Sequence, residues 1–147
     1  MSTAGYSGTP LPRKLGITEG AKVVLVRAPE HFQELLSPLP EGVRLIRRLG
    51  RDADVIVAFF TERARLEAGF DRLRAGMHDA GGLWIAWPKR ASGVPTDVTE
   101  DIVREIALTK GLVDNKVCAI DETWSGLRVV VRVRDRISRS GRATPRR

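Results

Sequence analysis

The chain has 147 residues, of which 42% are hydrophobic and 5% aromatic, and its formal net charge at pH 7 is +7. This length fits a single domain with a sizeable core. One cysteine and two histidines exclude an intramolecular disulfide and a cysteine-based zinc site, and no apolar run is long enough to cross a membrane. The first residues do not form a secretory signal, so we expect a cytoplasmic protein.

The positive charge is concentrated at the C-terminal end of the chain. Residues 132–147 hold seven of the 25 basic side chains and one of the 18 acidic ones, which leaves a net charge of +1 on the rest. This distribution argues against a basic binding face on the folded part. We therefore divide the chain into an N-terminal arm (1–16), a single α/β domain (17–134) and a disordered arginine-rich tail (135–147).

Strand-like and helix-like segments alternate along the chain. Helices or helical turns are expected at 12–16, 29–36, 61–77 and 97–110. Strands are expected at 22–27, 43–49, 54–60, 83–87, 113–120 and 126–134. This order predicts a small three-layer, Rossmann-like α/β fold with a mostly parallel sheet of about six strands. The last two strands should form an antiparallel hairpin, with 126–134 at the edge of the sheet.

Local signals mark the ends of two predicted helices. Thr61 is expected to cap the helix over 61–77, in which Gly69 favours a break. Asp97 with Glu100 three residues later resembles a capping box at the start of the helix over 97–110.

Two short segments resemble S-adenosylmethionine-dependent methyltransferases. Residues 53–57 look like the central strand of that fold, and residues 80–85 look like its Gly-Gly element followed by a strand. The resemblance implies a degenerate methyltransferase-like scaffold. Those enzymes carry a glycine-rich turn after the first strand, whereas this chain has Arg27, Ala28 and Pro29 there. We therefore identify no cofactor from the sequence, and the missing glycines disfavour S-adenosylmethionine.

A second resemblance covers about residues 3 to 134. It rests on the segments 3–11, 87–93 and 117–127. These segments resemble a family of small bacterial proteins known only as a domain of unknown function. That family implies no activity and no catalytic residues for this chain.

The loop after the fourth strand is the main candidate for ligand binding. Ligands of open α/β sheets bind beyond the carboxyl ends of the strands. Lys89, Arg90, Ser92 and Gly93 follow such an end and precede a helix, and Thr61 follows another strand. Cations, a hydroxyl and free backbone N–H groups could hold a phosphate or carboxylate there. The alternative is a solvated charged loop.

Isolated residues give two further alternatives. Asp121 and Trp124 lie in the predicted hairpin turn, where Trp124 either packs on the core or lines a ligand site. Cys118 is either a buried small residue or a reactive thiol. His31 and His78 stand alone in the sequence and are expected on the surface.

The basic tail is a candidate for weak contact with nucleic acid, or else a solubilising terminus. The tail arginines in question are Arg136, Arg139, Arg142, Arg146 and Arg147. No catalytic set is recognisable, so we expect a binding or regulatory module that takes an anionic small molecule or a protein partner. The alternatives are a divergent methyltransferase-like enzyme and a nucleic-acid-associated protein that acts through its tail. The sequence leaves the oligomeric state open.

Overall fold

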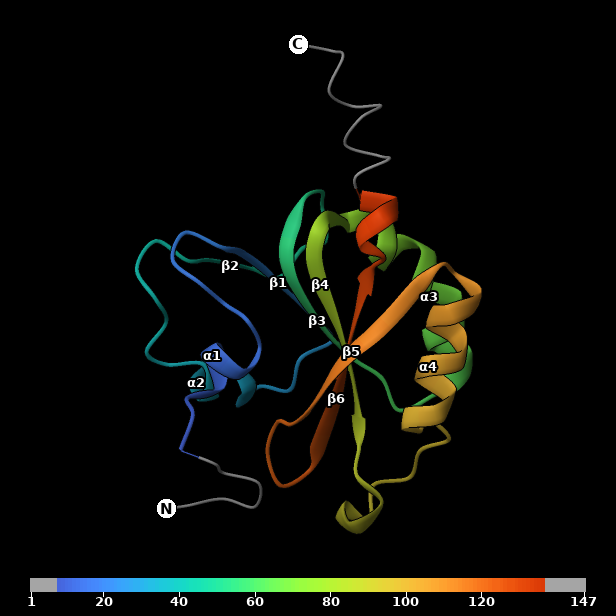
Figure 1. Cartoon of the computed structure of the whole chain (residues 1–147). Helices are drawn as coiled ribbons and strands as arrows, with labels where there is room; N and C mark the ends of the chain where they lie inside the picture. Colours follow the sequence, from blue (N-terminus) through green and yellow to red (C-terminus); the bar gives the residue numbers. More distant parts are fainter. Residues whose placement is uncertain (1–7, 137–147) are drawn as a thin grey trace.

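The computed structural model describes residues 8–136 and consists of one six-stranded sheet with helices on both faces (Figure 1). Its strands are β1 (Lys22–Val26), β2 (Arg44–Ile46), β3 (Ala53–Phe59), β4 (Met77–Pro88), β5 (Leu112–Ala119) and β6 (Trp124–Val131). Its helices are α1 (Leu11–Lys14), α2 (Phe32–Leu35), α3 (Arg63–Gly76), α4 (Glu100–Thr109) and the 3-10 turn η1 (Arg90–Ser92).

The order of strands across the sheet is β2-β1-β3-β4-β6-β5. Strands β2, β1, β3 and β4 run parallel to one another, and β6 is antiparallel to both β4 and β5. The predicted fold class is thus confirmed. The predicted edge is wrong, because β6 lies inside the sheet between β4 and β5. Strand β5 forms that edge instead.

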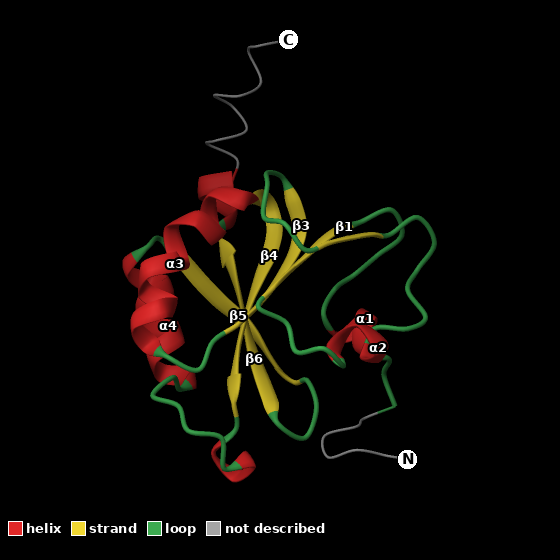
Figure 2. Ribbon diagram, turned by 180° about the vertical axis from the view of Figure 1, so that it is seen from behind, coloured by secondary structure: helices red, strands yellow, loops and turns green. Residues whose placement is uncertain are grey.

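Alternating side chains of the central strands build two cores, one on each face of the sheet. On one face Val24 and Ile56 belong to the cluster that packs under α3 and α4. On the other, Val23 and Val55 pack with residues of the α1 and α2 region. Figure 2 shows the two pairs of helices on opposite sides of the sheet. The structure therefore has the three layers that the alternation of elements predicts.

Trp84 in β4 anchors the N-terminal segment to the sheet. Its indole is fully buried, and its Nε1–H donates a hydrogen bond of 2.9 Å to the carbonyl of Leu15. Gly126 of the neighbouring strand faces the ring, where an added Cβ would lie 3.1 Å from a ring carbon. Trp87 belongs to the opposite core, as its spacing from Trp84 predicts.

The helix caps differ from the predicted ones. Helix α3 begins after Glu62, and Thr61 does not cap it. Asp97 does so from a distant loop, since its carboxylate accepts a 2.7 Å hydrogen bond from the backbone N–H of Arg63. Helix α4 is capped by Thr99, whose hydroxyl accepts from the N–H of Ile102. Both helices are therefore capped by a side-chain oxygen, but from another residue than the local pattern indicates.

The connection between β2 and β3 is unusually short. These strands are parallel and lie on either side of β1, yet only residues 47–52 join them. Such crossovers generally take a dozen or more residues and contain a helix. Leu49 of this connection packs near Gly76 at the end of α3, where an added Cβ would collide with the Leu49 side chain. Helix α3 runs unbroken through Gly69, contrary to prediction.

The described part of the chain ends in a helical turn. The backbone N–H groups of Asp135 and Arg136 both donate to the carbonyl of Arg132. Most of the predicted tail, including Arg139, Arg142, Arg146 and Arg147, lies outside the described residues. Within residues 8–136, no helix is both long and apolar enough to span a membrane.

Candidate functional site

The loop after β4 folds into a self-bonded turn. The Ser92 hydroxyl donates to the carbonyl of Lys89 over 2.7 Å and accepts from the N–H of Val94. The backbone N–H of Lys89 donates to the carbonyl of Thr123. Gly93 ends η1 with a left-handed φ of 79°. Several groups expected to hold an anion are therefore already partnered within the protein.

Arg90 and Gly93 line a cavity of 440 Å³ between this loop and the start of α4. Thr61 is joined to the same region by its backbone: its carbonyl accepts a hydrogen bond from the hydroxyl of Thr96, which lines the cavity. The structure thus brings part of the predicted loop site together. Asp121 and Trp124 do not line this cavity.

Asp121 organises the hairpin turn and contacts a histidine far away in sequence. Its Oδ1 accepts from the N–H groups of Thr123 and Trp124, and its Oδ2 lies 3.0 Å from Nε2 of His31. The Asp121 side chain is 15% exposed and that of His31 53%. His31 lies on the surface, as expected, but it has a partner in the structure, because the fold brings the loop after β1 to the turn after β5.

Trp124 packs on the core, which resolves the two alternatives for this residue. Its ring meets Phe59 edge to face with centroids 5.0 Å apart, and Phe59 meets Phe32 in the same manner at 4.9 Å. Aromatic pairs at these separations are favourable.

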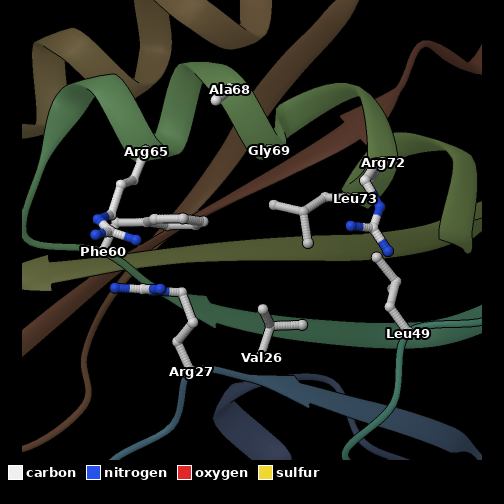
Figure 3. A pocket seen from close by; sticks show the side chains of 9 residues that line it. All are labelled: Val26, Arg27, Leu49, Phe60, Arg65, Ala68, Gly69, Arg72 and Leu73. Atoms are coloured by element: carbon white, nitrogen blue, oxygen red, sulfur yellow. The ribbon is translucent and has the colours of Figure 1, made fainter.

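A second cavity lies at the topological switch point, where the order of strands reverses along the sheet. The chain leaves β1 toward β2 on one side and leaves β3 toward β4 on the other, so the crevice between β1 and β3 is the switch point of the sheet. A groove of 360 Å³ begins there and runs along α3. It is lined by Val26, Arg27, Leu49, Phe60, Arg65, Ala68, Gly69, Arg72 and Leu73 (Figure 3). We call it the α3 groove.

Arg27 lies directly after β1, at the carboxyl edge of the sheet. Its Nε–H donates a hydrogen bond of 3.2 Å to the carbonyl of Phe59, and its guanidinium lies 5.6 Å from the centre of the Phe60 ring. Its backbone has a φ of 60°, in the left-handed region that favours glycine. Strained backbone of this kind tends to persist at functional sites.

We expect the backbone strain at Arg27 to be measurable with two substitutions. Arg27→Ala and Arg27→Gly both remove the guanidinium, but only glycine relieves the steric cost of a left-handed residue. The glycine variant should therefore be more stable than the alanine variant by about 1 kcal/mol. Urea denaturation of both proteins measures the difference. Equal stabilities would contradict the left-handed conformation.

The groove is rimmed by cations from two elements. Arg65 and Arg72 are seven residues apart and face the groove from α3, while Arg27 reaches it from β1. Arg65 also pairs with the exposed Glu62 at 3.0 Å. The residues that line the groove include no acid. The site therefore combines apolar walls with a positive rim.

Cys118 is buried in β5, with 4% of its surface exposed. Burial raises the pKa of its thiol, against the opposing effect of Lys14, Lys116 and Lys89. These observations favour the buried small residue over a reactive thiol. Within residues 8–136, no group of three His, Cys, Asp or Glu side chains could hold a metal ion.

The raised pKa of Cys118 predicts slow alkylation. At pH 8, iodoacetamide should modify the folded protein about tenfold or more slowly than the urea-unfolded chain, as measured by mass spectrometry. Because the folded pKa exceeds the unfolded one, the contribution of Cys118 to stability should be complete below about pH 8.5 and be lost as the pH rises through the folded pKa. Equal alkylation rates would show an accessible thiolate.

Several solved structures are similar to this chain in fold. A SAM-dependent methyltransferase from Aquifex aeolicus has a TM-score of 0.57 and 15% identity, with 80% of this chain and 85% of that chain covered. A DhpI–SAH complex has a TM-score of 0.54 at 11% identity, covering 82% and 81%. Aeropyrum pernix fibrillarin with natively bound S-adenosyl-L-methionine has a TM-score of 0.50 at 15% identity, covering 86% and 70%.

At these identities the similarity establishes the fold, which is that of SAM-dependent methyltransferases. No protein-family model matches the sequence, and no curated protein is similar to it. The resemblance to a family of unknown function therefore stays an expectation.

These comparisons correct the sequence-based view of the cofactor. The sequence indicates no cofactor, and its missing glycines disfavour S-adenosylmethionine, but this prediction is wrong as a guide to the fold, because similar folds hold S-adenosylmethionine or SAH. The physical reason lies in the backbone. Arg27 takes the left-handed conformation for which a glycine would ordinarily be needed, so the residue type alone is a poor guide to the shape of this turn.

Sequence reasoning missed the α3 groove. The switch point depends on the order of strands in the sheet, which no local pattern reveals. The spacing of Arg65, Ala68, Gly69 and Arg72 was visible, because residues at i, i+3, i+4 and i+7 share one face of a helix. This helix face carries charged side chains at its two ends and small residues at its centre. That pattern is the signal that could have indicated a ligand site.

Proposed function

We propose that this protein is a methyltransferase-like enzyme that binds an adenosyl cofactor of the S-adenosylmethionine type at the carboxyl edge of its sheet. The observation that carries this proposal is the coincidence of the switch point with the Arg27–Phe60 end of the α3 groove. The similarity to SAM-dependent methyltransferases over most of the chain supports the enzyme alternative over our first expectation of a binding module.

The residues at this end of the groove suit two parts of such a cofactor. Val26 and Phe60 offer apolar and aromatic surface for a base. The guanidinium of Arg27 offers a fork of donors for the carboxylate of the amino-acid part. The left-handed backbone at Arg27 also turns the chain sharply after β1. No lining residue is an acid that could bind the ribose hydroxyls.

When bound, S-adenosylmethionine supplies an electrophilic methyl group on its sulfonium. The same edge of the sheet also carries an imidazole. His31 follows β1, and Asp121 follows β5 and fixes the imidazole through the 3.0 Å contact. An imidazole oriented by a carboxylate is a competent general base. However, His31 and Asp121 flank residues of the core on the α1 and α2 side of the sheet, whereas the α3 groove lies on the other side, so we assign His31 no role toward a ligand of the groove.

Isothermal titration of the full chain with S-adenosylmethionine and with SAH tests the proposal. We expect binding that weakens about tenfold in Arg27→Met, because a charge-assisted hydrogen bond is lost. Arg90→Met, which removes a cation from the loop after β4, is the matched control and should bind normally. The proposal fails if neither compound binds at millimolar concentration, or if the loss occurs in Arg90→Met instead.

A further inference from the structure

The α3 groove exists because one crossover lacks a helix. Residues 47–52 carry the chain from β2 to β3 on the side of the sheet that α3 and α4 cover. The main contacts of these two helices are with β4, β5 and β6, in the part of the sheet farther from β2 (Figure 1). Val26, Ile46 and Leu49 consequently remain only partly buried against the core. The sheet thus keeps an apolar strip that its own described elements leave uncovered.

The wall of the groove that α3 forms allows a ligand to approach the helix backbone closely. Ala68 and Gly69 lie at its centre, between Arg65 and Arg72. A Cβ built on Gly69 would meet nothing within 4 Å, so the space beside it is open. A flat apolar body can therefore lie against the helix backbone, between α3 and the side chains of Val26 and Leu49 (Figure 3).

The positive charge around this space is only partly compensated. Arg72 makes no hydrogen bond or ion pair within the described part of the chain, and Arg27 donates to a backbone carbonyl. Arg65 pairs only with Glu62, and the side chains of both residues are more than half exposed. Guanidinium groups bind carboxylates and phosphates with paired hydrogen bonds. The groove is therefore electrostatically complementary to an anion.

We infer that the Gly69–Arg72 half of the α3 groove binds a small molecule with a flat apolar body and one anionic group. The α3 groove as a whole has a volume of 360 Å³, and its mostly apolar lining with a few placed cations is typical of small-ligand sites. This ligand class follows from the groove alone. Only its role as the methyl acceptor rests on the proposed function.

Three naphthalene compounds of the same shape and different charge form the test. The ¹⁵N-labelled full chain is titrated with 2-naphthoate, 2-naphthyl phosphate and 2-naphthylmethylammonium, and amide shifts are followed by NMR. We expect the two anions to shift the amides of Leu49, Gly69 and Arg72, and to bind at least about tenfold more tightly than the cation. The anion that binds more tightly shows whether the groove prefers a carboxylate or a phosphate.

Two variants separate the shape of the groove from its charge. Gly69→Leu fills the open space without removing a cation. Because replacing a glycine within a helix favours folding, this variant should fold but no longer bind the two anions. Arg72→Gln should weaken the anions about tenfold and leave the cation unchanged, while Arg90→Gln serves as the control. Unchanged naphthoate binding by Gly69→Leu, or no binding of either anion to the parent chain, would overturn the inference. In the second case a partner helix becomes the better occupant.

The same variants keep this inference apart from the proposed function. Gly69→Leu should still bind SAH, because the cofactor is assigned to the Arg27–Phe60 end. Naphthoate binding without any SAH binding would support the ligand class and remove its role as methyl acceptor. SAH binding without naphthoate binding would refute the ligand class alone.

Discussion

Replacing Trp84 by alanine is expected to lower the free energy of unfolding by about 3–5 kcal/mol. The indole is fully buried between the sheet and the N-terminal segment, so its loss leaves a large cavity. It also removes the partner of the Leu15 carbonyl, which the indole N–H binds at 2.9 Å. Guanidinium denaturation followed by far-UV circular dichroism measures the change.

Trp84→Phe separates the two contributions. It keeps most of the ring volume but leaves the Leu15 carbonyl without its donor, so we expect a smaller loss of about 1–3 kcal/mol. If Trp84→Phe costs as much as Trp84→Ala, the hydrogen bond rather than the packing dominates. If neither substitution lowers stability, the position of α1 against β4 is incorrect.

Gly81→Ala is expected to destabilise the fold by about 1–3 kcal/mol. A Cβ at this position would lie 2.7 Å from the carbonyl oxygen of Asp54 and 2.9 Å from that of Ala53. Both atoms belong to the backbone of β3, so the two central strands would have to move apart. Thermal unfolding of the full chain measures the loss.

Gly69→Ala is the matched control for this substitution. It adds the same methyl group, but into open space on a helix, where it should stabilise the protein by about 1 kcal/mol. The two substitutions are therefore expected to have opposite signs. A similar loss from both would show that the β3–β4 contact at Gly81 is looser than described.

The fold was largely predictable because its signals are local. Lys22–Val26 is rich in Val and Leu and Ala53–Phe59 in Val, Ile and Phe, a composition typical of buried strands of a parallel sheet. The placement of β6 was not predictable in the same way. A hairpin with β5 is a local event, but insertion of β6 beside β4 depends on long-range pairing such as that of Trp84 with Arg128.

The candidate site was predictable only in part. The composition of the loop after β4, with its cations, serine and glycine, indicated a ligand site. The structure does place Arg90 and Gly93 at a cavity. Arg27 gave no such signal, because a left-handed backbone is expected of glycine and not of arginine. The contact of His31 with Asp121 joins residues 90 positions apart, which a search for short motifs does not find.

The six-residue connection over 47–52 also makes this architecture adjustable by a single insertion. Surface connections tolerate added chain at little thermodynamic cost. A helix inserted near the exposed Gly50 would have room to settle beside α3 and convert the open groove into ordinary hydrophobic core. Gain or loss of a ligand site could thus follow from the length of one loop, with no change in any residue that lines the groove.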